Sequence, residues 1–182
     1  NRLNLTDYNL NDQEKRNSMS GEFAALAREL AEMPLWDEKH LFTPKDVKRM
    51  KDVEFCASLI LLYKKGVIDQ TDQSALNQAY EEYQTGYKEA EEDKVAICIV
   101  IDTLPRFFVS DEIAKFLKKK TQLYTLFSVL FYMQRNEVLL EDKHIANLKQ
   151  FVEVYSVFGN EMDFSDQIND SEKVIFDWLK KY

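Results

Sequence analysis

The chain has 182 residues, of which 45% are hydrophobic and 31% are charged; this composition fills a sizeable core and excludes wholesale disorder. Only four glycines and three prolines occur, so barrels, hairpin-rich folds and glycine-rich phosphate loops are disfavoured, and a helical protein is expected. The net charge of −8 is unfavourable for generic binding to nucleic acids and to anionic membranes, because both attract clustered cations.

The first predicted elements are two helices separated by a short break. Asn11 and Glu14 have the spacing of a capping box, which predicts a short polar helix over 12–17. A second, amphipathic helix follows and ends before Pro34. Its predicted inward residues have helical spacing: Phe23, Leu26, Ala27, Leu30 and Ala31. Residues 35–42 are predicted to form a loop.

A strong helix start follows at residues 43–46. Thr43 can cap the helix, Pro44 suits its first turn and Asp46 favours the positive end of the helix dipole. We expect one helix from here to the Lys64-Lys65-Gly66 sequence, which places cations in the last turn and glycine after it. Its second half is apolar on most sides, which predicts a central position in the fold.

The middle of the chain predicts a helix that begins at Asp69 or Thr71 and carries a shared inward face. The residues of this face are Leu76, Ala79, Tyr80, Tyr83, Tyr87 and Ala90. A tyrosine stripe of this kind can stack nucleobases, but core packing is favoured beside an acidic outer surface. The β-branched run 95–101 fits a buried strand or a helix. We predict a helix that continues from the acidic stretch or restarts after it and ends at Pro105.

The C-terminal part predicts three further helices and a final amphipathic one. Ser110 begins a helix that is interrupted by the lysines of 118–120; a buried helix over 123–133 and an amphipathic helix over 142–155 follow. After a loop at 159–168, the final helix carries a short apolar face: Val174, Ile175, Trp178 and Leu179. Together these elements predict an all-α, multi-helix bundle with no substantial sheet.

The common catalytic and metal-binding motifs are absent from this sequence. No GxSxG, CxxC or HExxH occurs, and His40 and His144 lie far apart, so no metal site is expected. Cys56 and Cys98 lie in apolar runs, which favours reduced core thiols in a cytoplasmic protein over a disulfide. No uncharged apolar stretch reaches the ~18 residues of a membrane span, so no membrane partner is expected.

Two polar clusters depart from this pattern. The first cluster lies at a predicted helix start and is rich in side chains that can form hydrogen bonds: Leu10-Asn11-Asp12-Gln13-Glu14-Lys15-Arg16-Asn17. Such a helix start suits binding of an anion or of the edge of a nucleotide base. The simpler interpretation is a capped surface helix. The second cluster is Arg49-Met50-Lys51-Asp52, where an arginine and an aspartate three residues apart on one helix face can pair with each other.

These clusters, in this order, resemble the N-terminal family of GmrSD-type restriction endonucleases. The family pattern reads F-x-R-L-N, then L-N-x-Q-E-[IL]-R-N, then a helix, then R-x-x-D before a long apolar helix. This chain has Arg2-Leu3-Asn4, the 10–17 cluster and the 49–52 cluster in the same order, and the resemblance covers residues 2–62. Lys15 departs from it, because the family has an aliphatic residue there.

The resemblance implies a ParB/sulfiredoxin-like catalytic core upstream of this chain. In the family a D-G-Q-Q-R motif in that core is associated with nucleotide hydrolysis or nuclease activity against modified phage DNA, and many members add an HNH nuclease region. Neither motif occurs here. We therefore expect a cytoplasmic fragment of a prokaryotic defence protein whose parent would use a nucleoside triphosphate and a divalent metal. Residues 1–18 would end the truncated core, and 19–182 would form the helical bundle domain.

Carried over by position, the resemblance assigns supporting residues and no catalytic residue or metal ligand. It places these residues along or beside a nucleotide- or DNA-binding cleft: Arg2 and Asn4 at its edge, Gln13, Glu14, Arg16 and Asn17 bracing or lining it, and Arg49 and Asp52 supporting it. The fragment alone is expected to need no cofactor and to be inactive, since the catalytic motif is missing. The alternative is a non-catalytic helical module that binds a partner protein.

Overall fold

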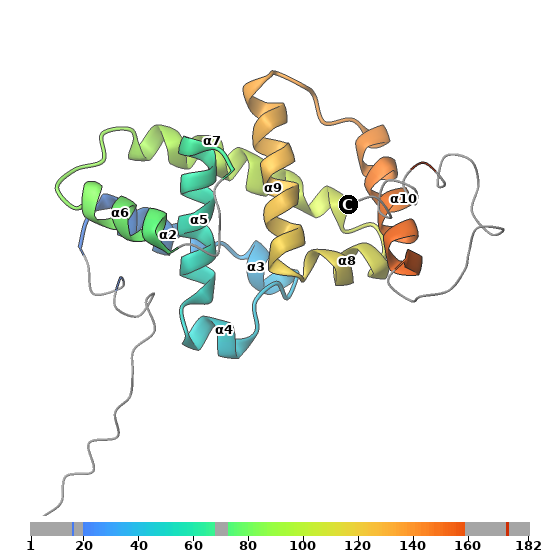
Figure 1. The fold of residues 1–182 in the computed structure, drawn as a ribbon, viewed down its shortest axis with the longest axis horizontal. Helices are drawn as coiled ribbons and strands as arrows, with labels where there is room; N and C mark the ends of the chain where they lie inside the picture. The colour runs from blue at the N-terminus through green and yellow to red at the C-terminus, as the bar shows by residue number, and fades with distance from the viewer. Residues whose placement is uncertain (1–15, 17–19, 68–72, 159–173, 175–182) are drawn as a thin grey trace, which may run out of the picture.

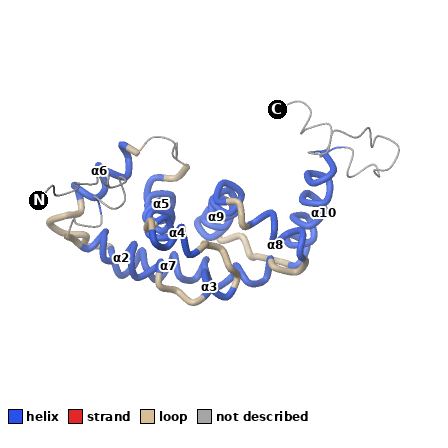
Figure 2. The backbone as a smooth tube through the Cα atoms, turned by 90° about the horizontal axis from the view of Figure 1, so that it is seen from below, coloured by secondary structure: helices blue, strands red, loops and turns tan. Residues whose placement is uncertain are grey.

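The computed structural model describes residues 16, 20–67, 73–158 and 174. Every regular element within these ranges is a helix and no strand occurs there (Figures 1 and 2), so the predicted all-α bundle is confirmed. Arg16 and Val174 are helical. The remainder of the predicted helix at 12–17, the loop at 159–168 and the rest of the final helix lie outside the described residues.

The helices form two crossing layers. In chain order they are α2 (Glu22–Ala31), α3 (Leu35–Glu38), α4 (Pro44–Lys48), α5 (Lys51–Lys65), α6 (Ser74–Glu82), α7 (Ala90–Thr103), the 3₁₀ helix η1 (Leu104–Phe107), α8 (Asp111–Leu117), α9 (Lys120–Arg135) and α10 (Asp142–Phe158). The pair α5 and α9 packs across a layer that contains α2 and α7 (Figures 1 and 2). At one end α6 packs on α2 and α5, and at the other α8 packs on α9 and carries α10.

The core is centred on α5, as its apolar sequence predicts. From Val53 to Leu62 every side chain except Glu54 is buried. An aromatic group joins α5 to α3 and α9: the ring of Phe55 lies 6.2 Å from those of both Trp36 and Phe127. Most of the predicted inward residues of α2 and α8 are buried in the same cluster, and Ala31 is only partly buried against it. The prediction that 123–133 is buried holds for one face of α9, because Val129 and Tyr132 are exposed. Apolar burial on this scale, at roughly 25 cal/mol per Å², is the main favourable term in folding.

Two predicted boundaries near α4 are wrong. Residues 35–42 are not all loop, because α3 begins after Pro34 and buries Leu35 and Trp36. The helix predicted from residue 44 to 65 is broken at Met50, whose φ of 56° is left-handed. The break has a packing reason: α4 buries no residue, whereas α5 is buried along most of its length, so α4 turns away from the core.

The start of α4 matches its prediction. Thr43 Oγ1 accepts from the Asp46 amide at 3.2 Å, and the Asp46 carboxylate accepts from the Thr43 amide at 2.8 Å. This reciprocal pair is a capping box with proline in the first turn. Local rules therefore placed this helix start correctly.

The tyrosine stripe is a core feature, although it does not lie on one helix. The predicted starts at Asp69 or Thr71 lie outside the described residues. The structure describes α6 from Ser74 onward. α6 ends at Glu82 and α7 begins at Ala90, so Tyr87 lies in the connection. The rings of Tyr83 and Tyr87 are 4.5 Å apart, and both stack on Phe23 of α2. Core packing is confirmed, and the continuous helix from Leu76 to Ala90 is wrong.

Close approach of the backbone explains Gly21 at the start of α2. Its φ is +130°, and an added Cβ would lie 2.9 Å from the carbonyl oxygen of Tyr83. A side chain here would push α2 away from the turn after α6. Only glycine accommodates both the backbone angle and the contact.

The predicted run 95–101 is helical and belongs to α7, so the helix prediction is confirmed. Within the described residues no helix has the length and apolar character needed to cross a bilayer. Cys56 and Cys98 are free thiols; Cys56 lies in the core as predicted, whereas Cys98 is only partly buried. Burial raises the pKa of Cys56 well above its ordinary value. A buried thiol with a raised pKa is an inert core residue rather than a nucleophile.

A buried polar network ties α5 to α7. The Asp93 carboxylate accepts from Lys64 Nζ at 2.9 Å and from the Tyr87 hydroxyl at 2.5 Å. The Lys64 ammonium also lies 4.7 Å from the centre of the Tyr87 ring. The amide of Tyr87 donates to the Glu22 carboxylate, so α2 joins the network. Three helices, α2, α5 and α7, and the connection before α7 are therefore held together by one polar network.

This network predicts a loss of stability in alkaline solution. Burial and the hydrogen bond to Asp93 raise the pKa of Tyr87; burial acts to lower the pKa of Lys64, but the Asp93 bond and nearby negative charges raise it overall. Unfolded Tyr and Lys lose protons near pH 10, while the folded groups keep them. The stabilisation that this network contributes should therefore be complete below about pH 10. Above that pH the free energy of unfolding should fall.

Urea unfolding at a series of pH values from about 8 to 11 measures this effect. Tyr87→Phe should show a shallower fall than the parent chain. Tyr132→Phe is the matched control, because Tyr132 is 66% exposed. Equal slopes for the parent and Tyr87→Phe would contradict the assignment to this network.

Candidate functional site

Arg16 is the one residue of the first polar cluster that the structure describes, and it is buried. Its side chain is 2% exposed. Its Nε donates to Asn77 Oδ1 at 2.8 Å, and its Nη2 donates to Gln73 Oε1 at 2.5 Å. Charge-assisted bonds of this kind are stronger than neutral ones. They attach Arg16 to the start of α6, a contact that the sequence did not predict.

Gln73 connects Arg16 to a polar pocket. The pocket has a volume of about 290 Å³ and lies between α4, α5, the start of α6 and the start of α9. Its lining residues are Asp46, Lys51, Glu54, Phe55, Ser58, Gln73 and Lys120. Lys51 belongs to the second polar cluster. Gln73 therefore contacts Arg16 of the first cluster and shares the pocket lining with Lys51 of the second.

The charges in this pocket are already engaged. Lys51 pairs with Glu54 at 2.9 Å, and the hydrogen bonds from Thr43 lower the pKa of Asp46. Lys120 donates to the carbonyl of Leu41 and lies 4.0 Å from the centre of the Phe42 ring; burial lowers the pKa of its ammonium. Two acids and two lysines balance, so the pocket offers donors and acceptors without excess charge. Such a lining suits the polar edge of a base or sugar better than a phosphate.

The remaining predicted site residues do not line this pocket or lie outside the described part. Arg49 follows the last residue of α4, and Asp52 is in the first turn of α5. The idea that they share one helix face is wrong, because the break at Met50 separates them. Burial raises the pKa of Asp52, and its buried Oδ1 has no hydrogen-bond partner within the described structure. Five predicted residues lie outside the described ranges: Arg2, Asn4, Gln13, Glu14 and Asn17.

Sequence analysis missed two residues of this pocket. Gln73 is 57 positions from Arg16, and no local motif marks it. Lys120 belongs to the lysines that interrupt the predicted helix at 118–120, and its side chain is half-buried over Phe42. The only available signal was that Lys120 begins an apolar helix, which draws its aliphatic stem toward the core.

A divalent metal has no ligand set in the part of the chain that the structure describes. No group of three His, Cys, Asp or Glu residues lies close enough there to hold one. The two acids of the polar pocket, Asp46 and Glu54, are occupied by Thr43 and Lys51. The metal that the family resemblance implies for the parent protein therefore does not fit the described residues.

Comparisons of the chain with models of protein families, with curated proteins and with solved structures find no match. The resemblance to the GmrSD-type family therefore depends on the motifs in residues 2–62 alone. The structural observations that concern these motifs are the buried position of Arg16 and the polar pocket beside Gln73.

Replacing Arg16 should destabilise the fold. Arg16→Ala leaves the oxygens of Gln73 and Asn77 without their donor, and we expect it to lower the free energy of unfolding by about 1–2 kcal/mol. Arg16→Lys should recover only part of this loss, since lysine lacks the forked donor geometry. Urea unfolding measures both. Lys48→Ala, an exposed control on α4, should change the value by less than about 0.5 kcal/mol; equal effects for Arg16 and Lys48 would contradict the bracing role.

Proposed function

We propose that this chain is the helical part of a prokaryotic defence protein that resembles modification-dependent, nucleotide-hydrolysing restriction endonucleases. In this proposal the catalytic core precedes residue 2 in the parent protein and holds the nucleoside triphosphate phosphates and the metal. The helical part is non-catalytic. It forms one wall of the nucleotide cleft and fixes the motif segment against the bundle.

The observation that carries the proposal is the buried Arg16. On a surface helix the guanidinium would stay in solvent, because burying a charge costs several kcal/mol unless it is hydrogen-bonded. Arg16 instead bonds to Gln73, the residue before α6, and to Asn77 of α6. Gln73 then forms one edge of the polar pocket. This arrangement supports a bracing role for Arg16 and a contact role for the residues around Gln73.

Hydrolysis by the parent protein tests this proposal. The full-length parent should hydrolyse a nucleoside triphosphate in the presence of Mg²⁺, and the isolated chain should not. In the parent, Gln73→Leu should weaken nucleotide binding by about fivefold or more, the loss expected for one hydrogen bond. Gln78→Leu is the matched control, because Gln78 is exposed on α6 and does not line the pocket.

The same experiment separates the alternative. A parent that lacks D-G-Q-Q-R upstream and binds no nucleotide would exclude the nuclease proposal and favour the protein-interaction module. Hydrolysis by the isolated chain would also contradict the proposal, because the chain would then contain a catalytic group that we do not assign.

A further inference from the structure

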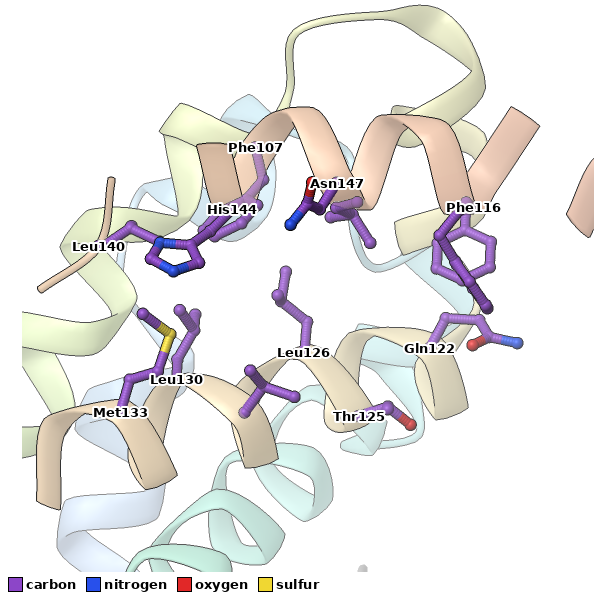
Figure 3. Close-up of a pocket in the computed structure, with 13 residues that line it drawn as sticks. Phe107, Phe116, Gln122, Thr125, Leu126, Leu130, Met133, Leu140, His144 and Asn147 are labelled. Carbon is purple, nitrogen blue, oxygen red and sulfur yellow. The ribbon is translucent and has the colours of Figure 1, made fainter. Parts of the chain in front are cut away.

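A second hollow lies at the other end of the molecule, between α9 and α10. Its volume is about 280 Å³, close to the lower limit of roughly 300 Å³ for small-molecule pockets. It exists because α10 packs mainly on α8 and stands away from α9. Its walls are aromatic and aliphatic side chains of four elements, among them Phe107, Phe116, Leu126, Leu130, Leu148 and Phe151. Leu126 and Leu130 point from α9 toward α10 (Figure 3).

His144 supplies a fixed hydrogen-bond donor at one end of this hollow. The amide of Glu141 donates to His144 Nδ1 at 3.0 Å, so the neutral ring carries its proton on Nε2. No residue in the described part of the chain accepts from Nε2. The ring lies at the end formed by Leu140 and Met133, and the Asn147 amide faces the space between the helices (Figure 3). His144 is half-buried in this lining.

No Asp, Glu, Lys or Arg side chain lines this hollow. Apart from the His144 imidazole, each lining residue is apolar or an uncharged polar side chain. The charges near the His144 end are paired with each other: Lys143 with Glu141 at 2.9 Å, and Arg106 with Asp142 at 3.0 Å. An ionic ligand would lose its hydration in this hollow without gaining a counter-charge, which is costly. The lining therefore discriminates against carboxylates and ammonium groups.

We propose that this hollow binds a small uncharged molecule with an apolar, aromatic-sized body and one acceptor oxygen, such as a carbonyl. The body fills the space between the phenylalanine and leucine side chains, and the oxygen accepts from His144 Nε2. Asn147 offers a second donor at the opening. This inference is independent of the proposed function, because the polar pocket and this hollow share no lining residue.

Binding of three probe molecules to the native chain tests the proposal. Acetophenone has the ring and the carbonyl, isopropylbenzene has the same shape without the acceptor, and benzoate carries a charge. Methyl resonances of Leu126, Leu130 and Met133 report binding by NMR. We expect acetophenone to bind about fivefold or more tightly than isopropylbenzene, the value of one hydrogen bond, and benzoate to bind most weakly.

Variants locate the site. His144→Phe should weaken acetophenone binding to the level of isopropylbenzene and leave isopropylbenzene unchanged. Val129→Trp fills the hollow and should abolish binding of both, whereas Val47→Trp should change neither. Val129 and Val47 are matched, being 50% and 47% exposed, and only Val129 lines the hollow. Equal affinities for the three probes, or no methyl shifts at millimolar acetophenone, would overturn the proposal without bearing on the nuclease assignment.

Discussion

Phe127→Ala should lower the free energy of unfolding by about 3–5 kcal/mol, the cost of removing a fully buried phenylalanine. Phe127 is 0% exposed. Its ring lies 6.2 Å from Phe55 of α5, 6.3 Å from Trp36 of α3 and 5.9 Å from Phe131 of α9. The substitution leaves a cavity where three elements meet, and the close-packed surroundings cannot collapse to fill it.

Thermal and urea unfolding measure this loss, and Tm should fall by on the order of 10 °C. Tyr132→Ala on the same helix is the control. Its side chain is 66% exposed, so the change should stay within about 0.5 kcal/mol. Phe127→Leu should cost less than Phe127→Ala, since it keeps most of the buried volume. A cost below about 1 kcal/mol for Phe127→Ala would contradict the central position of α9.

Asp93→Ala should be the second most damaging substitution that we predict. It removes the shared acceptor of Lys64 and Tyr87. The largely buried ammonium then keeps only the more distant Glu89, at 3.9 Å, and the buried hydroxyl loses its acceptor. Removing one member of a fully buried ion pair costs about 3–5 kcal/mol. The Lys64 side chain is 18% exposed and keeps some hydration, so we expect about 2–3 kcal/mol.

A double-mutant cycle separates the ion pair from general damage to α7. Asp93→Leu combined with Lys64→Met should cost less than the sum of the two single substitutions, because no charge is then left unpaired. Glu92→Ala is the adjacent control on the exposed face of α7 and should be nearly neutral. Additive effects of Asp93→Leu and Lys64→Met would show that the two side chains do not interact.

The candidate site shows where sequence reasoning reaches its limit. The motif identified Arg16, and the spacing of polar residues identified the cluster at 49–52. Neither pattern contains the information that Arg16 contacts Gln73, since 57 positions separate them. Local rules describe residues within about four positions of each other on a helix. The polar pocket is formed by four segments, and its composition depends on how they pack.

The same limit explains the errors at the helix boundaries. Residues 44–65 contain no proline or glycine after Pro44, so nothing local predicts a break at Met50. The break occurs because the apolar surface of α5 must face the core while α4 has nothing to bury. Packing energy outweighs the small cost of one left-handed residue.

The sequence by itself determined that this protein is helical, where the helices capped by Thr43 and Ser110 begin, and many of the apolar side chains that are buried. Amphipathic spacing, capping residues and the scarcity of glycine act locally, so each can be recognised directly from the sequence. Only the tertiary structure decided the partners of Arg16, the network around Asp93 and the hollow beside His144. These features depend on the distances between helices, which follow from the packing of the whole chain rather than from any one segment.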